Sequence, residues 1–125
     1  MPVPNDLQAL LHPDVELTLD VPAFTAVTRT SDTESRVRVR GDLDCTTAPV
    51  LGELLTDLID SGVTSIVVDL AEVSFLGVAG LNVLLKAQNR ACAAGGSLLL
   101  ANPDRCARRV LALTGLDTAL PISEA

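Results

Sequence analysis

Side chains that could carry chemistry gather around two short stretches of this sequence. The first is Asp42-Leu-Asp44-Cys45-Thr46-Thr47, and the second runs from Ser74 to Asn82. Each follows a run typical of a strand and precedes a run typical of a helix. Backbone N–H groups at a helix start lack partners within the helix and carry partial positive charge. Both stretches therefore favour the binding of another molecule.

Single reactive groups in these stretches allow a functional and a structural interpretation. Cys45 stands at a predicted helix start, where a thiolate is favoured, so a redox switch is one hypothesis. The Ser74 and Thr46 hydroxyls are candidates for modification, but turn and capping groups have the same sequence pattern. The carboxylates of Asp42 and Asp69 have a weaker case, since each can satisfy N–H groups of a turn.

The sequence excludes several kinds of chemistry. The acidic residues are scattered, with no pair placed for acid–base catalysis, no nucleophile–base set and no phosphate-cradling glycine loop. With one His and no C-x-x-C pair, a metal site is not expected. We therefore expect a binding protein that is not an enzyme and that has no cofactor and no metal.

Charge and apolar runs restrict the partners and the compartment. The net charge of −7, the absence of Trp and Tyr and the presence of only two Phe argue against nucleic-acid binding. No apolar run approaches the roughly 18 residues of a membrane span, and the start of the chain lacks the pattern of a secretory signal. We expect a cytoplasmic protein without membrane insertion, where its three cysteines stay reduced.

A central strand–helix unit must position the second stretch. Ile66–Asp69 is short and β-branched, which predicts a strand buried on both faces of a parallel sheet. Apolar residues at helical spacing from Val78 to Leu85 predict a helix that packs back onto that sheet. A short loop over 70–77 is expected between them, with the helix start bracketed by Gly77 and Gly80. Partners of open α/β sheets bind at the carboxyl ends of the strands, so we expect the working surface here.

The remaining segments predict one α/β domain. A hairpin, a helix, a strand, a second helix and a short edge strand are expected at residues 24–30 with 36–40, 46–60, 97–101, 104–115 and 120–122. This pattern gives a mixed, mostly parallel sheet of four to five strands with three main helices. We place the domain at residues 23–125. The Pro-rich residues 1–22 are interpreted as an N-terminal extension that no long regular element crosses.

Several motifs occur in unbroken order over roughly residues 24–122. They are Gly41-Asp-Leu-Asp44, Val67-Val-Asp-Leu70, Val73-Ser-Phe-Leu76 with Gly80-Leu81, and Val110-Leu-Ala-Leu-Thr-Gly-Leu-Asp117 with Pro121-Ile122. Together they resemble the STAS domain, and in particular the bacterial anti-sigma factor antagonists. The resemblance implies a regulatory protein that acts by binding.

The resemblance also implies a mechanism. In this family an unphosphorylated antagonist binds a serine kinase that doubles as an anti-sigma factor, and this binding releases the sigma factor and so regulates transcription. The kinase then phosphorylates a Ser or Thr at the start of the central helix, in a run that reads Asp-Ser-Ser/Thr-Gly-Leu. Here Gly77 replaces the Asp and Ala79 replaces the phosphorylated residue. Ala79 has no hydroxyl and cannot carry a phosphate.

This departure leaves the regulation open. Either the chain has lost its switch, or it is held in the uncharged, binding-competent form, with Ser74 or Cys45 as alternative positions for a modification. The alternative function is a STAS scaffold subunit of a lipid-transport or stress-signalling complex. A homodimer is compatible with either function.

The predicted partner-binding surface joins the rim around 42–47 to the stretch from Ser74 to Asn82. Leu76 and Leu81 are expected to supply apolar contact, with core packing as the alternative for Leu81. The predicted contact residues are Asp42, Asp44, Cys45, Thr46, Leu76, Gly77, Val78, Gly80, Leu81 and Asn82.

Overall fold

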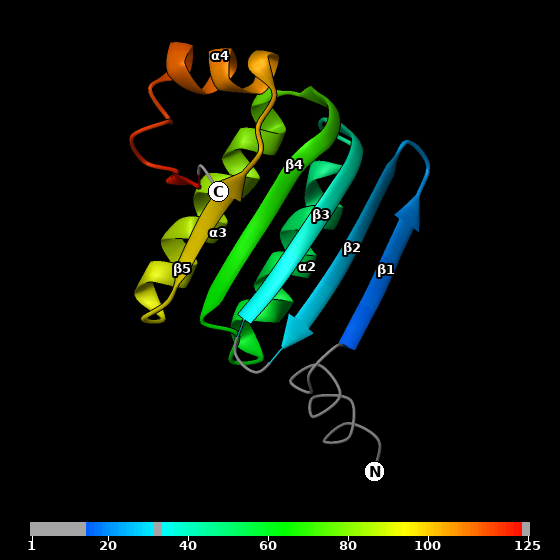
Figure 1. The fold of residues 1–125 in the computed structure, drawn as a ribbon, viewed down its shortest axis with the longest axis vertical. Helices are drawn as coiled ribbons and strands as arrows, with labels where there is room; N and C mark the ends of the chain where they lie inside the picture. The colour runs from blue at the N-terminus through cyan, green and yellow to red at the C-terminus, as the bar shows by residue number, and fades with distance from the viewer. Residues whose placement is uncertain (1–14, 32–33, 124–125) are drawn as a thin grey trace.

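The computed structural model describes residues 15–31 and 34–123 of the chain (Figure 1). Its elements in chain order are β1 (Val15–Val21), β2 (Phe24–Ser31), β3 (Glu34–Leu43), α2 (Ala48–Asp60), β4 (Ser65–Leu76), α3 (Val78–Ala93), β5 (Ser97–Ala101), α4 (Arg105–Thr114) and β6 (Ile122–Ser123). Among these described helices, none is long and apolar enough to cross a membrane.

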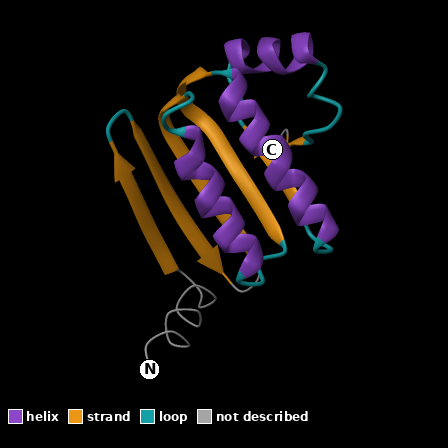
Figure 2. Ribbon diagram, turned by 180° about the vertical axis from the view of Figure 1, so that it is seen from behind, coloured by secondary structure: helices purple, strands orange, loops and turns teal. Residues whose placement is uncertain are grey.

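All six strands join one sheet in the order β1-β2-β3-β4-β5-β6. The pairs β1–β2 and β2–β3 are antiparallel, and the pairs from β3 to β6 are parallel. Helices α2 and α3 lie side by side on one face of the sheet, and α4 lies across its end (Figures 1 and 2). The predicted mixed α/β class is confirmed, and the sheet has one strand more than expected.

The additional strand is β1, which lies in the segment that we interpreted as an extension. The prolines that argued against regular structure stand outside it, because Pro13 precedes β1 and Pro22 lies in the turn that follows. The proline-free residues between them pair with β2 from Val15↔Thr30 to Val21↔Phe24. Alternating apolar residues from Val15 to Val21 were a signal for this strand. Residues 1–14 of the predicted extension lie outside the described residues.

Strand β4 is also longer than predicted. The expected loop over 70–77 continues the strand to Leu76, because β4 pairs with β3 as far as Leu43↔Leu76. The ladder contains register shifts between Arg38 and Arg40 and between Gly41 and Asp42, which accommodate the extra length. The strand therefore delivers residues 74–76 to the sheet's rim, directly before α3.

The core lies between the sheet and the helix layer. Val37 and Val39 of β3 are buried, while the arginines that alternate with them are exposed on the face without helices. Leucines at helical spacing complete the core from the other side, at Leu51, Leu55 and Leu58 of α2 and Leu81 and Leu84 of α3. Each fully buried leucine side chain contributes about 1.5–3 kcal/mol to the free energy of unfolding.

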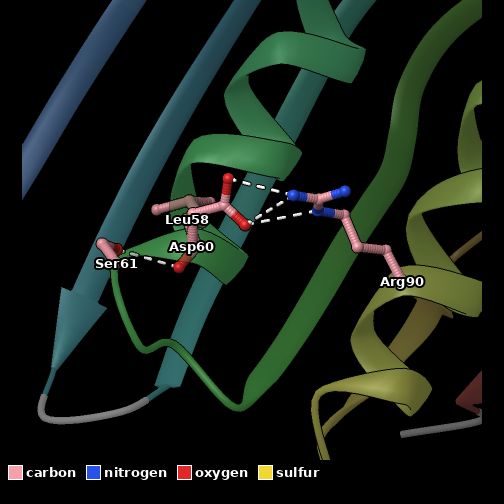
Figure 3. A network of polar contacts seen from close by, with 4 residues as sticks. All are labelled: Leu58, Asp60, Ser61 and Arg90. Atoms are coloured by element: carbon pink, nitrogen blue, oxygen red, sulfur yellow. Dashed lines mark hydrogen bonds and ion pairs between the residues drawn. The ribbon is translucent and has the colours of Figure 1, made fainter.

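The ends of α2 and α3 are joined by an exposed ion pair. Arg90 donates from Nη2 to both carboxylate oxygens of Asp60, at 2.9 and 3.1 Å, and from Nε at 3.3 Å (Figure 3). The Ser61 hydroxyl donates to the Leu58 carbonyl at 2.8 Å and caps the end of α2. Because both charged side chains are half exposed, the pair fixes geometry more than it adds stability.

Gly41 permits the close approach of β3 to the β1–β2 turn. Its φ is +101°, and a Cβ there would collide with the backbone carbonyl of Ala23. The next amide, of Asp42, donates to that same carbonyl at 2.9 Å. Only glycine therefore fits both the conformation and the space.

We expect Gly41→Ala to lower the free energy of unfolding by about 3–4 kcal/mol, because it adds a backbone collision to the strain of a positive φ. Gly62→Ala is the matched control. Gly62 has a φ of +103° with open space around its Cβ position, so about 1–2 kcal/mol is expected. Urea denaturation measures both losses, and equal losses would contradict the packing argument.

Candidate functional site

The two stretches singled out in the sequence meet at the rim of the sheet. The carboxyl ends of β3 and β4 are neighbours there, with Asp42 opposite Phe75 and Leu43 opposite Leu76. Helix α3 begins at Val78, with Gly77 as its N-cap in an extended conformation. The Gly77 amide donates to the Leu43 carbonyl at 2.9 Å and so ties the helix start to the end of β3. The helix start lies where the sequence predicted it.

The surface at this helix start is apolar and uncharged. Val78 is 69% exposed and Phe75 is 55% exposed. The Phe75 ring lies against Gly77, where an added Cβ would be 3.0 Å from its Cε2. Asn82, one turn after Val78, is also exposed, and α3 has no acidic residue in its first turn. We call Phe75, Gly77, Val78, Ala79 and Asn82 the rim patch.

Three residues predicted to contact a partner are instead packed inside. Leu76 is 7% exposed and Leu81 is 1% exposed, so neither supplies apolar surface. Gly80 is also buried, and a Cβ there would lie 3.0 Å from the Leu43 Cβ. These residues let the first turn of α3 pack closely on the end of β3. The expectation that Leu76 and Leu81 contact a partner is therefore wrong, and for Leu81 the alternative of core packing is the observed one.

Phe75 is the surface residue that sequence reasoning missed. We placed residues 70–77 in a loop and assigned the apolar contact to the neighbouring Leu76. The signal was the pair Phe75-Leu76 near a strand end, because only one of two adjacent strand residues can face the core. The choice between them depends on the register with β3, which the sequence of β4 alone does not give.

Asp44 organises the turn that leads from β3 into α2. Its Oδ1 accepts hydrogen bonds from the Thr46 hydroxyl at 2.7 Å and from the amides of Thr46 and Thr47 at 2.9 and 3.1 Å. The hydrogen bond from the Thr46 hydroxyl, followed by those from the two amides, lowers the pKa of Asp44 below its ordinary value. This carboxylate satisfies the amides of Thr46 and Thr47 before the helix, while the Thr47 hydroxyl accepts from the Asp44 amide at 3.0 Å.

The other side chains of this turn have separate roles. The buried Thr47 hydroxyl donates to the Asp42 carbonyl at 2.6 Å, which closes the turn. Cys45 is exposed and free. The helix begins three residues after it, at Ala48, and the amides of Thr46 and Thr47 are already bonded to Asp44. The hypothesis of a redox switch was based on unpaired amides at the helix start that would favour a thiolate, and these amides are already paired.

The hydroxyl of Ser74 lies on an exposed residue of β4, next to Phe75. Thr46 is exposed too, but its hydroxyl is committed to Asp44. Neither has a neighbouring carboxylate–histidine pair among the described residues, where no cluster of three His, Cys, Asp or Glu side chains forms a metal site either. The rim has the properties of a contact surface.

Asp69 connects β3, β4 and the residue after β5 on the face of the sheet that no described helix covers. Its carboxylate accepts from Arg36 Nη2 at 2.9 Å, from the Ala71 amide at 3.0 Å and from Asn102 at 3.3 Å. Partial burial alone would raise the pKa of Asp69, but these hydrogen bonds outweigh burial and lower that pKa. The structural interpretation of Asp69 is the one that these contacts support.

Two comparisons of sequence identify relatives of this chain. A family model described as "Mlab, STAS domain" matches residues 26–122. The anti-sigma-B factor antagonist of Bacillus subtilis (strain 168) is 31% identical over 93 residues, which cover 74% of this chain and 84% of that protein.

Solved structures agree with this result. An anti-sigma factor antagonist from Mycobacterium paratuberculosis is 30% identical, with a TM-score of 0.74 over 86% of this chain and 92% of that one. The anti-sigma factor antagonist SpoIIAA in its unphosphorylated form is 20% identical, with a TM-score of 0.66 over 87% of this chain and 88% of its own. The latter likeness concerns the fold alone.

The lowered pKa of Asp44 predicts a pH-dependent contribution to stability. The ionised carboxylate stabilises the fold fully above the ordinary pKa of 3.8, and this contribution is lost as the pH falls through the lower pKa of the folded state. We expect Asp44→Ala to be less stable than wild type at pH 7, with a deficit that shrinks at a pH of about 2.5.

Urea denaturation at the two pH values checks this. Asp42→Ala is the control, because the Asp42 side chain makes no hydrogen bond or ion pair within the described part of the chain. A deficit of Asp44→Ala that is the same at both pH values would contradict the role given to the ionised carboxylate.

Proposed function

The chain belongs to the STAS domain family, and on that premise we propose that it is an anti-sigma factor antagonist. It binds an anti-sigma factor and thereby releases a sigma factor to act in transcription. Two relatives at 30% identity or above are named as antagonists of this kind. The observation in the structure that carries the proposal is the exposed, uncharged rim patch at the start of α3.

The rim patch offers two kinds of contact to a protein. Phe75 and Val78 provide apolar surface that water otherwise covers, and burying it drives association. Within the described structure no side chain caps α3. Its first amides are therefore available to a carbonyl or carboxylate of the partner. The N-cap Gly77 has no side chain that projects from this surface, so a partner's backbone can approach it closely.

The regulation of this antagonist differs from the pattern that the resemblance implies. Ala79 lies half-buried at the second position of α3 and carries no hydroxyl. A phosphate there would bring negative charge into the centre of the rim patch and disfavour binding through desolvation and repulsion. Without it, the surface keeps its binding-competent form, so the protein acts constitutively or is controlled elsewhere, with exposed Ser74 and Cys45 as the alternative positions.

The finer points of the proposal come from the resemblance. The partner is an anti-sigma factor of the serine kinase type, the protein acts in the cytoplasm as a binding protein without catalysis, and a homodimer is compatible with this action. A scaffold subunit is the second candidate, and Ala79 favours it because a scaffold needs no phosphate switch. Transcription with a purified sigma factor and its anti-sigma factor separates the two, since only an antagonist restores transcription on addition.

We expect Val78→Glu to weaken binding to the cognate anti-sigma factor at least tenfold, because a charge must then be buried at the centre of the contact. Titration calorimetry with each anti-sigma factor of the source organism measures the affinity. Leu113→Glu is the matched control, since Leu113 is 77% exposed on α4. An unchanged affinity of Val78→Glu would place the interface elsewhere, and a complex with none of the anti-sigma factors would contradict the function.

A second variant tests the lost switch. Incubated with a kinase-type anti-sigma factor and ATP, Ala79→Ser should acquire phosphate at residue 79, since the hydroxyl then stands at the exposed helix start. Mass spectrometry of the wild-type chain is expected to show none at that residue. Ser74→Ala combined with Ala79→Ser is the control for phosphate on the neighbouring hydroxyl. Failure of Ala79→Ser to gain phosphate would show that more than the hydroxyl has been lost.

A further inference from the structure

Two large apolar side chains are exposed outside the rim patch. Of the four such side chains in the described part of the chain, Phe75 and Val78 belong to the rim patch, which leaves Leu17 at 45% and Leu113 at 77% exposed. Leu17 lies on β1, at one edge of the sheet, and Leu113 lies on α4. Single exposed leucines are common on proteins, so the residues around each decide what it can bind.

The surroundings of Leu17 form an acidic groove between β1 and α2. The groove has a volume of about 430 Å³, and among its lining residues are Leu17, Leu19, Val50, Leu54 and the two carboxylates Glu53 and Asp57. Both carboxylates are exposed, and neither forms an ion pair within the described residues. Like charges four residues apart on a helix repel each other, and α2 contains no basic residue. The groove therefore favours an apolar group that is flanked by cations.

No described helix covers this part of the sheet. Neighbouring strands lie about 4.8 Å apart and a helix is about 10 Å across, so one helix covers roughly two strands. Helices α2 and α3 lie on this face of the six strands, and β1 and β2 extend beyond α2 (Figure 2). The uncovered width is about that of one helix.

Helix α4 presents two arginines and a leucine on its outer face. It packs on the domain through buried Ala107 and Leu111. On the opposite side of the helix, Arg105, Arg109 and Leu113 are exposed at the spacing i, i+4, i+8. Neither of these arginines takes part in an ion pair with a described residue. An exposed leucine flanked by cations is the group that the groove favours.

We propose that α4 of one copy of this chain binds in the groove of a second copy. The two arginines are four residues apart on α4, and the two carboxylates are four residues apart on α2. In an antiparallel arrangement both arginines therefore lie opposite a carboxylate at once, with Arg109 opposite Glu53. Leu113, one turn beyond Arg109, then lies at the Val50 end of the groove. Charge and apolar surface are both matched in this register.

The two surfaces of one chain lie on opposite sides of the domain. Strand β1 is the edge strand of the sheet, and α4 lies across the end of the sheet on the side of β4 and β5 (Figures 1 and 2). The contact is therefore head to tail, and each pair still offers a free groove and a free α4 to further copies. One helix in a groove buries less than the roughly 1,200 Å² of a stable interface, so we expect a Kd on the order of 0.1–1 mM.

Sedimentation equilibrium of the full-length protein tests the proposal. From about 10 µM to about 1 mM, the average mass should rise beyond that of two chains, and high salt should reverse this rise because it screens exposed charges. Arg105→Glu with Arg109→Glu should weaken self-association at least tenfold, as should Glu53→Arg with Asp57→Arg, because each places like charges in the contact. Mixed one to one, the two variants should associate as the wild type does, since opposite charges then face each other again.

Arg38→Glu with Arg40→Glu is the matched control. It makes the same charge change as the α4 variant, but on the face of the sheet without helices, and it should associate like the wild type. A wild-type chain that stays single at about 1 mM would overturn the proposal. So would a mixture of the two charge-reversed variants that fails to associate. Growth that stops at two chains and persists in both variants would also overturn it, in favour of a symmetric dimer through another surface.

This self-association goes beyond the function proposed for the rim patch and is tested separately from it. At protein concentrations on the order of 10 µM, which suffice for calorimetry with an anti-sigma factor, a contact of this affinity is mostly dissociated. Leu113→Glu therefore still serves as the control for Val78→Glu in that experiment. Either surface can fail its test without affecting the result for the other.

Discussion

The carbonyl end of β3 at Leu43 is the constraint on which the rest of the structure depends. Its oxygen accepts from the Gly77 amide at 2.9 Å and fixes where α3 begins. Its side chain lies so close to Gly80 that a Cβ there would be 3.0 Å away. The helix start, the end of β4 and the turn into α2 are therefore held together around one residue. Displacing α3 by a single residue would break both contacts.

This constraint decides which apolar residues face outward. With Leu76 and Gly80 held against β3, the neighbouring Phe75 and Val78 have no interior to enter and remain on the surface. In a chain with a net charge of −7, the surface at this position carries no charge. Glycine at the N-cap and alanine at position 79 preserve that property, since neither can introduce an acidic group there.

Sequence patterns within single segments predicted most of the helices and strands. The span Ser97–Ala101 and the helix ending at Asp60 appear as predicted, because an apolar run or a helical stripe bounded by Gly or Pro is complete within its own segment. Strand β1 carried such a local signal in its alternating apolar residues, but the length of β4 and the exchange of Leu76 for Phe75 at the surface were not predictable in this way. Each depends on pairing with a partner strand, and the register of that pairing is not encoded in one segment.

The sheet order has a consequence for how the chain folds. Every strand from β1 to β6 pairs only with its neighbours in the chain, so no pairing has to wait for a distant segment to arrive. The hairpin of β2 and β3 closes only a short connection, and each later strand–helix unit adds to an edge that already exists. Assembly can therefore proceed in the direction of synthesis, with α3 and the rim patch formed before the last strand is made.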